Sequence, residues 1–248
     1  MLQRYWTTPA GDYSNLYNDM LQQINLLVAG AAGSGKSTVE NELIYTALYR
    51  SPAAIQFILI DPKGTELDEY RQLPHTIYYG QTAQECARGL EYGLNIARAR
   101  FKDMKRQHRR MFDGSDVYII IDELMHLMIK AKKQTLDTLT DIMTIARASR
   151  IHVIAISQNT TTITIPAILR CNFDSRLGLR TATAQDSRNV IGVKGCELLP
   201  APQLTGRAQG YYMHSGLLEL YDLEKTPDAE RHRIIEFWER QRKPRLFA

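Results

Sequence analysis

The sequence predicts an α/β protein: a mostly parallel central sheet flanked by helices on both faces, with a β-hairpin and a helix near the carboxyl terminus. Short, continuous apolar runs, typical of strands buried on both faces, alternate with longer segments of helical periodicity. Several runs lead directly into glycine-rich or acidic turns, as parallel strands do at the carboxyl edge of a sheet. With 248 residues and 44% hydrophobic content, the chain can bury this core as one domain.

Periodicity and chain breakers assign the elements of the first half. The apolar runs are rich in β-branched and aromatic residues, which favours strands, and the longer segments repeat apolar residues at helical spacing. Ser51-Pro52 and Asp113-Gly114 break the chain between elements. The expected order is a strand at 24–29, a helix at 36–49, a strand at 55–60, a helix at 82–111 and a strand at 117–121.

The second half of the chain continues the alternation of strands and helices and then ends in a hairpin and a helix. Glycine-containing residues 214–216 separate two strand-like runs, which indicates a hairpin. Ile234, Ile235 and Trp238 form one stripe of an amphipathic segment. The expected order is a helix at 135–149, a strand at 151–157, a short helix ending near 169, a strand at 176–181, a helix at 185–191, the hairpin at 208–220 and a last helix at 228–241.

The segment NLLVAGAAGSGKSTV, residues 25–39, contains the pattern G-x-x-x-x-G-K-S between a predicted strand and a predicted helix. This is the context of a phosphate-binding P-loop, in which glycines let backbone N–H groups approach a polyphosphate. Lys36 would reach the β- and γ-phosphates, and Ser37 would bind Mg²⁺. An ordinary glycine-rich turn is the structural alternative. The residues expected to bind ATP are Gly30, Ala31, Ala32, Gly33, Ser34, Gly35, Lys36, Ser37 and Thr38.

Two acids follow the strand VYIII, at the same predicted edge of the sheet as the P-loop. Asp122 is expected to contact Mg²⁺, and Glu123 to polarise the water that attacks the γ-phosphate. The alternative is a helix N-terminus at which two acids interact favourably with the helix dipole. Asp61 and Ser157-Gln158 should lie at this edge as well, because they also follow predicted strands.

Composition excludes several other classes of protein. No apolar stretch is long enough to span a membrane, and residues 1–15 do not resemble a signal peptide, so a cytoplasmic location is expected. Cys86, Cys171 and Cys196 are widely separated, odd in number and without paired histidines, so neither a disulfide framework nor a zinc site is indicated. The net charge of +4 does not distinguish a nucleic-acid-binding protein from other soluble enzymes. Residues 98–110 and 240–245, however, concentrate basic side chains. Each basic segment is either a solvated surface or a DNA contact.

Other segments follow the pattern of a single family. They are IDPKGTEL at 60–67, LPH at 73–75, IDELMHL at 121–127, IARASRIHVIAISQ at 145–158 and DSRNV at 186–190. Over about residues 20–240 the chain thereby resembles the motor domain of the FtsK/SpoIIIE family of DNA translocases, a RecA-like group of P-loop ATPases related to HerA. The resemblance implies an N-terminal segment at 1–22 and an ATPase motor domain at 23–248.

The same resemblance assigns two further residues. Gln158 corresponds to a polar sensor at the end of its strand. Arg147 corresponds to an arginine finger that reaches the γ-phosphate bound by the adjacent subunit of a ring, a role worth about 10³ to 10⁵ in rate. The alternative for Arg147 is an exposed arginine that offsets the dipole at a helix end.

The resemblance implies a ring, a hexamer, that hydrolyses ATP and pumps double-stranded DNA. The chain departs from the family pattern at Ser157–Thr160, SQNT, where the family continues T-Q-R-P, and at Arg150, which replaces a glycine. It also shows no membrane-spanning region and no winged-helix module. We therefore expect the motor of a plasmid, conjugative element or phage, with a relaxase or recombinase as a possible partner. The alternative is a module like the type VII secretion ATPases, which act on polypeptides.

Overall fold

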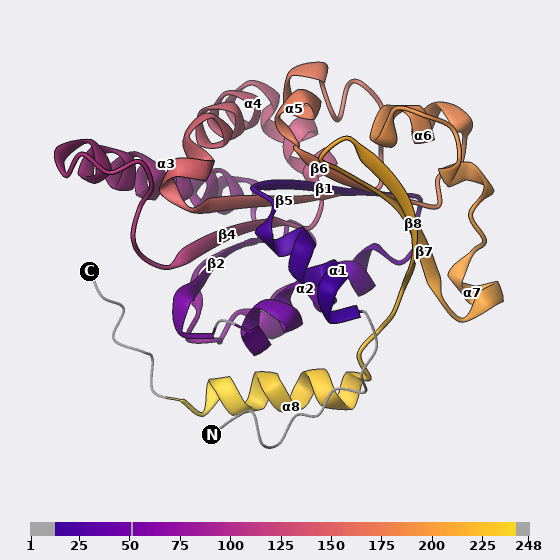
Figure 1. Cartoon of the computed structure of the whole chain (residues 1–248), viewed down its shortest axis with the longest axis horizontal. Helices are drawn as coiled ribbons and strands as arrows, with labels where there is room; N and C mark the ends of the chain where they lie inside the picture. Colours follow the sequence, from indigo (N-terminus) through magenta and orange to yellow (C-terminus); the bar gives the residue numbers. More distant parts are fainter. Residues whose placement is uncertain (1–12, 51, 242–248) are drawn as a thin grey trace.

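One mixed sheet organises the computed structural model of this chain, which describes residues 13–50 and 52–241 (Figure 1). The strand order is β3-β2-β4-β5-β1-β6-β7-β8. Neighbouring strands from β3 to β6 are parallel, whereas β7 pairs antiparallel with both β6 and β8. The strands are β1 (Asn25–Ala29), β2 (Ile55–Ile60), β3 (Thr76–Gly80), β4 (Asp116–Ile121), β5 (Ile151–Ser157), β6 (Ser175–Leu179), β7 (Ala208–His214) and β8 (Leu217–Leu223).

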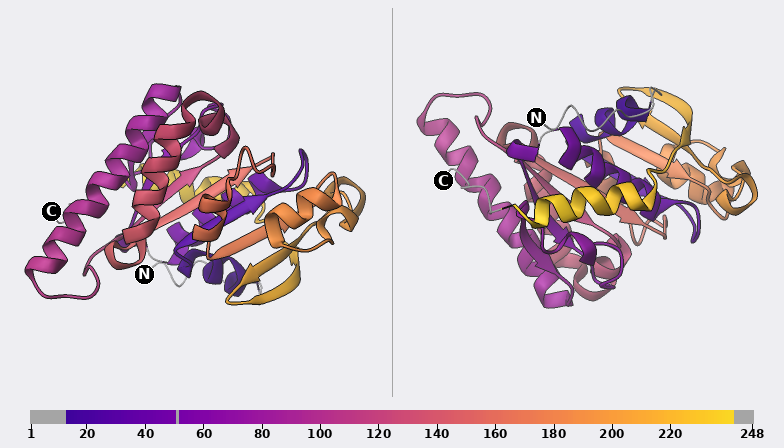
Figure 2. Two further views of the ribbon diagram at one scale, coloured as in Figure 1. Left: turned by 90° about the horizontal axis from the view of Figure 1, so that it is seen from above. Right: turned by 90° about the horizontal axis from the view of Figure 1, so that it is seen from below.

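Helices cover both faces of the sheet (Figure 2). α1, α2 and α8 pack on one face, and α3, α4, α5 and α6 on the other. The helices are α1 (Tyr13–Gln22), α2 (Lys36–Arg50), α3 (Ala83–Arg106), α4 (Leu124–Ser149), α5 (Ala167–Asn172), α6 (Ala184–Ile191), α7 (Pro202–Thr205) and α8 (Asp228–Glu239). The predicted α/β architecture, with its carboxyl-terminal hairpin and helix, is therefore confirmed.

The parallel strands are apolar along their whole length because both of their faces are buried. In β4, for example, Tyr118 and Ile120 pack with α1 and α2 on one side, whereas Ile119 and Ile121 pack with α3 and α4 on the other. Successive side chains of a strand point to opposite faces, so each strand contributes to two separate cores. This two-sided packing fixes the register of β1 between β5 and β6.

The strand order brings the predicted edge residues together. β1, β2, β4 and β5 run in the same direction and are neighbours in the order β2-β4-β5-β1. Their carboxyl ends, which lead into Asp61, Asp122, Gln158 and the P-loop, therefore lie in one row along one edge. This is the edge at which an open α/β sheet binds its ligand.

The structure differs from the sequence prediction most clearly in four elements. β3 has no counterpart among the predicted strands, and α1 forms where no helix is expected. The helix expected from residue 135 begins instead at Leu124 and passes through a non-helical residue, Ala131, with φ −146° and ψ 50°. The helix expected to reach residue 111 ends at Arg106. The strands 55–60 and 151–157 have the predicted bounds.

Several predictions concern the ends of the chain and the cysteines. Residues 1–12, and residues 242–245 of the second basic segment, lie outside the described residues. Among the helices that are described, none combines the length and the apolar content required to cross a bilayer. Cys86, Cys171 and Cys196 are free thiols.

Candidate nucleotide-binding site

A pocket of about 400 Å³ opens at the carboxyl edge of the sheet. The P-loop forms one wall, the turn after β2 and the end of β4 form a second, and α7 closes the side beyond the loop. Six of the nine residues predicted to bind ATP line this pocket. Three are on the loop, Ala32, Gly33 and Gly35, and three are in the first turn of α2, Lys36, Ser37 and Thr38. Gly30, Ala31 and Ser34 are not among the lining residues, but the Ala31 carbonyl oxygen accepts a hydrogen bond from the backbone N–H of Ser34 within the loop.

Two glycines of the loop are required by the backbone. Gly33 has φ +69° and Gly35 has φ +102°, which L-residues rarely adopt. A Cβ on Gly35 would also lie 2.6 Å from the Cβ of Ala208, the first residue of β7. Gln203 of α7 donates a hydrogen bond from Nε2 to the carbonyl oxygen of Gly33 at 3.1 Å. The carboxyl-terminal part of the chain therefore packs directly against the loop.

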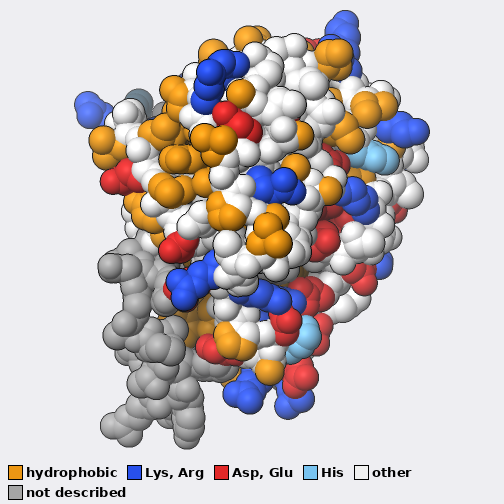
Figure 3. Space-filling model, turned by 90° about the vertical axis from the view of Figure 1, so that its right-hand side faces the viewer, with side chains coloured by type: hydrophobic (Ala, Val, Ile, Leu, Met, Phe, Trp, Pro, Cys, Tyr) orange, Lys and Arg blue, Asp and Glu red, His pale blue; other side chains and the backbone are white. Residues whose placement is uncertain are grey.

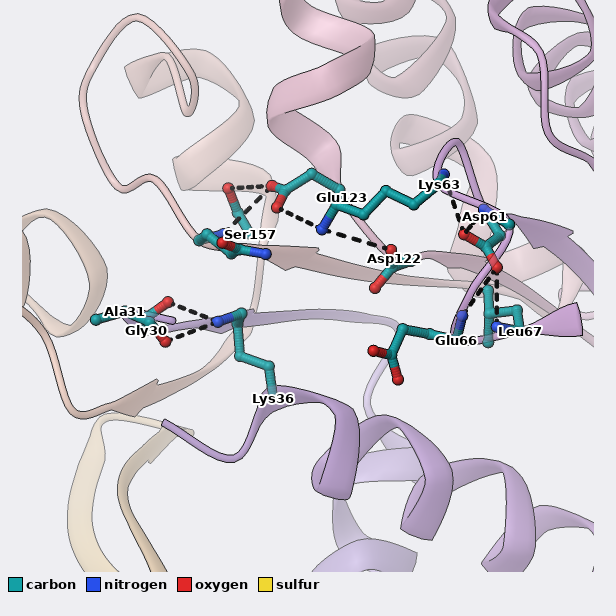
Figure 4. Close-up of polar contacts among 12 residues, drawn as sticks. Gly30, Ala31, Lys36, Asp61, Lys63, Glu66, Leu67, Asp122, Glu123 and Ser157 are labelled. Carbon is teal, nitrogen blue, oxygen red and sulfur yellow. Dashed lines mark hydrogen bonds and ion pairs between the residues drawn. The ribbon is translucent and has the colours of Figure 1, made fainter. Parts of the chain in front are cut away.

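Lys36 lies within the loop that it is expected to serve (Figure 4). Its Nζ donates hydrogen bonds to the carbonyl oxygens of Gly30 at 3.0 Å and Ala31 at 2.8 Å. Burial lowers the pKa of Lys36 to about 8; the charge of Lys63 adds to this effect, and Glu123 opposes it. The ammonium thus remains mostly charged at neutral pH, next to the space that the pocket offers to an anion.

Asp122 has the environment of a cation ligand. Its Oδ2 is buried and has no hydrogen-bond partner. Burial raises the pKa of Asp122 to about 6; Lys63 opposes the shift, while Asp61 and Glu66 add to it. A cation would stabilise such a carboxylate. Mg²⁺ commonly takes one or two protein ligands together with phosphates and water, which fits Asp122 and Ser37 on the pocket wall.

A cation bound by protein groups alone is not indicated. Within residues 13–50 and 52–241, no group of three or more His, Cys, Asp or Glu side chains is arranged to hold a metal ion. The fit is therefore to a metal that arrives with the phosphates of a nucleotide.

Glu123 is held by donors from two other strands. It is 2% exposed, and its Oε1 accepts hydrogen bonds from Ser157 Oγ at 3.4 Å and from the backbone N–H of Gln158 at 3.3 Å. Its Oε2 lies 3.4 Å from Nζ of Lys63. Gln158 itself is exposed and lines the pocket. The structure therefore brings Glu123 and Gln158 together at the predicted edge.

Sequence reasoning did not resolve the roles of the turn that follows β2. Asp61 is fully buried and accepts hydrogen bonds from the backbone N–H groups of Lys63, Gly64, Glu66 and Leu67 at 2.8 to 3.2 Å. It therefore builds the turn rather than entering the pocket. The residues that do line the pocket from this turn are Lys63 and Glu66. In the sequence alone, the run D-P-K-G at 61–64 is compatible both with a simple turn and with a Lys63 near the site.

Arg147 lies far from the site that its own chain forms. It is in the last turn of α4, which leads back to the amino end of β5, and its side chain is 75% exposed. Its Nη2 contacts Asp174, just before β6, at 3.4 Å. Arg147 is thus at the amino edge of the sheet, and the pocket is at the carboxyl edge.

Arg150 explains one departure from the family pattern. It caps α4 in the left-handed conformation, with φ 55°, where a glycine is favoured. Its guanidinium binds Asp116 through two hydrogen bonds of 2.7 Å. Burial alone would raise the pKa of Asp116, but hydrogen bonds from His152 and Arg150 outweigh it and bring that pKa to about 2. The ion pair with Asp116 offsets the cost of holding a residue other than glycine in the left-handed conformation.

Comparison with known proteins agrees with this site. A sequence model of the FtsK/SpoIIIE family matches residues 11–216. The chain belongs to the FtsK/SpoIIIE family. Among curated relatives, the DNA translocase FtsK of Clostridium acetobutylicum is 31% identical over 197 residues, which are 73% of this chain and 26% of that protein. The chain thus spans about a quarter of the length of this FtsK/SpoIIIE relative.

Solved structures support the fold of the family. The pCW3 conjugation coupling protein TcpA, in a monomer form with ATPγS, has a TM-score of 0.74 at 20% identity and covers 88% of this chain and 66% of its own. The cytoplasmic domain of the Thermomonospora curvata type VII secretion ATPase EccC has a TM-score of 0.72 at 20% identity, over 90% of this chain and 29% of its own. These structures confirm the RecA-like fold, and the match to the FtsK/SpoIIIE family confirms the class of P-loop ATPase.

Proposed function

We propose that this chain is the motor of a ring-forming translocase that hydrolyses ATP in the cytoplasm and pumps double-stranded DNA for a plasmid, conjugative element or phage. The observation that carries the proposal is the separation of Arg147 from an otherwise assembled nucleotide site. The P-loop, Asp122 and Glu123 line or border one pocket, whereas the arginine is at the opposite edge of the sheet. A second subunit can supply that arginine.

The chemistry follows from the residues of the pocket. Lys36 binds the β- and γ-phosphates, and Ser37 and Asp122 hold Mg²⁺, which would neutralise charge on the phosphates when bound. Glu123 accepts a proton from the attacking water. The backbone N–H of Gln158 orients Glu123. The side chain of Gln158 lines the same pocket, where it can act as the sensor of the γ-phosphate. Arg147 of a neighbouring subunit stabilises the transferring phosphoryl group.

The surface supports association with further copies. Figure 3 shows hydrophobic side chains gathered on the side of the molecule that carries α6, α7 and β8. Exposed apolar residues of these segments and their connections are Val193, Leu198, Leu204, Leu217, Leu218 and Leu220. Such patches commonly mark interfaces between proteins. This side also carries Gln203, which lines the nucleotide pocket, so a subunit that covers it would lie next to the bound nucleotide. We propose a hexamer.

Basic side chains and the relatives support DNA as the substrate. The curated relatives are named DNA translocases. The end of α3 and the segment that follows expose basic residues, among them Arg106 and Arg109. Lys130–Lys133 and the loop after Gln158 are candidate linings of a central channel. Contacts of this kind bind phosphates without reading bases, so binding should weaken steeply with salt. A relaxase or recombinase would select the DNA.

One observation favours a second candidate. The type VII secretion ATPase EccC is about as similar in structure as TcpA. In that case the ring would move polypeptides, and DNA would not affect turnover.

The deciding experiment is the rate of ATP hydrolysis of the purified chain with and without linear duplex DNA, at low and at high salt. We expect stimulation by duplex DNA that is lost as salt is raised. A rate that DNA leaves unchanged at every salt concentration, together with stimulation by a secreted polypeptide, would favour the second candidate. Glu123→Gln protein serves as the control for contaminating ATPases.

A further inference from the structure

Lys63 is a cation that the pocket places beside the two acids that follow β4, Asp122 and Glu123. Its Nζ lies 3.4 Å from Oε2 of Glu123 and 3.9 Å from Oδ2 of Asp122, and Figure 4 shows the side chain reaching across from its turn to both of them. The two acids are almost completely buried, but the Lys63 side chain is 39% exposed. One end of this ion pair is therefore fixed and the other can move.

The turn that presents Lys63 is rigid. Asp61 binds four backbone N–H groups of residues 63–67, and Gly64 adopts φ +68°. β2 lies next to β4 in the sheet, with Ile60 paired to Ile121, so the residues that follow the two strands are neighbours. The backbone therefore holds Lys63 beside Glu123, and only its side chain is free to change partners.

Glu123 has no free oxygen in this arrangement. Ser157 and Gln158 occupy Oε1, and Lys63 neutralises Oε2. A water that approaches Oε2 meets the ammonium of Lys63, which lies 3.4 Å from this oxygen. Activation of water by Oε2 therefore requires that the ammonium move elsewhere.

The pocket contains a position that would draw it. Lys63 lines the same pocket as Lys36, Ser37 and Thr38, where the terminal phosphate of ATP would bind. The pocket thus has an ammonium group on each of two walls, Lys36 on one and Lys63 on the other. A γ-phosphate between them would provide Lys63 with a more highly charged partner than Glu123. ADP lacks this group.

We propose that Lys63 is a positioning residue that exchanges partners within one subunit. It restrains Glu123 and balances Asp122 until a triphosphate is bound, and it then contacts the terminal phosphate and releases Oε2 of Glu123. The exchange rests on the proposed role of Glu123 as base, and it restricts the active form of that base to sites that hold a triphosphate.

The first test is nucleotide discrimination without hydrolysis. Dissociation constants for ADP and for the β,γ-imido analogue of ATP, both with Mg²⁺, are measured for the wild type, Lys63→Gln and Lys63→Arg. A hydrogen bond to a charged group corresponds to roughly tenfold or more in affinity. Lys63→Gln should lose about that factor for the imido analogue and less than about twofold for ADP, and Lys63→Arg should retain most of the discrimination. Equal losses for both nucleotides, or no loss, would overturn the proposal.

Lys225→Gln is the matched control. Lys225 also forms a lysine–carboxylate pair, with Asp228 at 3.0 Å, but it lies before α8, outside the residues that line the pocket. It should leave both dissociation constants unchanged. A circular dichroism spectrum like that of the wild type would show that Lys63→Gln folds. If Lys63→Gln does not fold, Lys63→Arg is compared with the wild type instead.

The second test is a double-mutant cycle between Lys63 and Glu123, followed by melting temperature. In nucleotide-free protein, the shifts of Lys63→Gln and Glu123→Gln should not add, because the two side chains are in contact. With the imido analogue and Mg²⁺ the shifts should become additive. Additive shifts without nucleotide, or coupling that persists with the analogue, would each contradict the exchange. Wild-type turnover of Glu123→Gln would instead refute Glu123 as the base, and it would leave the discrimination test intact.

Discussion

Arg147 and Lys36 lie at opposite edges of the same sheet. Lys36 begins α2 directly after the P-loop, at the carboxyl edge, whereas Arg147 ends α4 near the amino end of β5 and contacts Asp174. The connection between them is a rigid parallel sheet, so no movement of a side chain can bring Arg147 to the phosphates of its own subunit.

Mixing two inactive variants tests whether the arginine acts between subunits. Lys36→Ala should abolish nucleotide binding, and Arg147→Ala should reduce turnover by about 10³ or more. In a mixture, some sites combine an intact P-loop with an intact arginine, so ATPase activity should recover partly, with a maximum at an intermediate ratio.

The control for this experiment is Arg98→Ala. Arg98 is also an exposed arginine on a helix, paired with Asp141 at 2.8 Å, and its removal should leave turnover near the wild-type rate. If no ratio of the two inactive variants restores activity, the intersubunit role is wrong.

Glu123→Gln should bind ATP but hardly hydrolyse it. Glutamine keeps the size of the side chain and can still accept hydrogen bonds from Ser157 and Gln158, but it cannot take a proton from water. We expect a loss of turnover of about 10² to 10⁴ with the dissociation constant for ATP little changed. Single-turnover hydrolysis and equilibrium binding measure the two quantities. Parental turnover would show that another group is the base.

Glu40 predicts an unusual dependence of stability on pH. Its carboxyl is 1% exposed, and neither oxygen has a hydrogen-bond partner. Burial, together with the charge of Asp122, raises the pKa of Glu40 well above its ordinary value. A raised pKa means that the folded protein holds this proton more tightly than the unfolded chain, so Glu40 lowers stability as the pH rises above about 4.5.

Glu40→Gln should remove this effect, because the amide is never charged. Urea denaturation at pH 5 and pH 8 should show a variant that is at least as stable as the wild type at pH 8, and a smaller loss of stability between the two values. A variant that is less stable than the wild type at pH 8 would show that the carboxylate has a stabilising partner.

Arg150 and Asp116 yield a prediction about two substitutions at one position. Both Arg150→Gly and Arg150→Ala remove the ion pair with Asp116, but only glycine also relieves the left-handed backbone at φ 55°. Arg150→Ala should therefore be less stable than Arg150→Gly by about 1 kcal/mol. Urea denaturation at neutral pH measures the difference, and equal stabilities would show that the backbone cost is negligible.

The same pair has a dependence on pH of the opposite sign to Glu40. Because the folded pKa of Asp116 is depressed to about 2, its contribution is present above the ordinary pKa near 4 and is lost as the pH falls toward 2. Removal of Arg150 should reduce the slope of stability against pH in this acid range.

The strands that the sequence predicts with the correct bounds consist mostly of apolar, largely β-branched residues. IQFILI and IHVIAIS are buried on both faces, so their composition alone separates them from helices. β3, TIYYG, is short, half-buried and at the edge of the sheet, and it lacks an apolar run of this kind. The first turns of α4 follow the two acids directly, and the interruption at Ala131 disturbs the helical period, which explains the missed residues 124–134.

The site could be predicted as a set of residues, but not as a set of contacts. The P-loop, Asp122 and Glu123 are recognised from local motifs that follow strands. The contact of Lys63 with Glu123 depends on β2 lying next to β4, and the contact of Gln203 with Gly33 depends on a connection across 170 positions. Strand order and long-range packing of this kind leave no local pattern in one sequence.

The packing of Ala208 and Gln203 against Gly35 and Gly33 has a practical consequence. A fragment cut before residue 200 would retain every letter of the phosphate-binding signature and still lack the surface against which that loop is moulded. The phosphate-binding loop of this chain is therefore not an independent unit, because its shape depends on residues that are synthesised about 170 positions later.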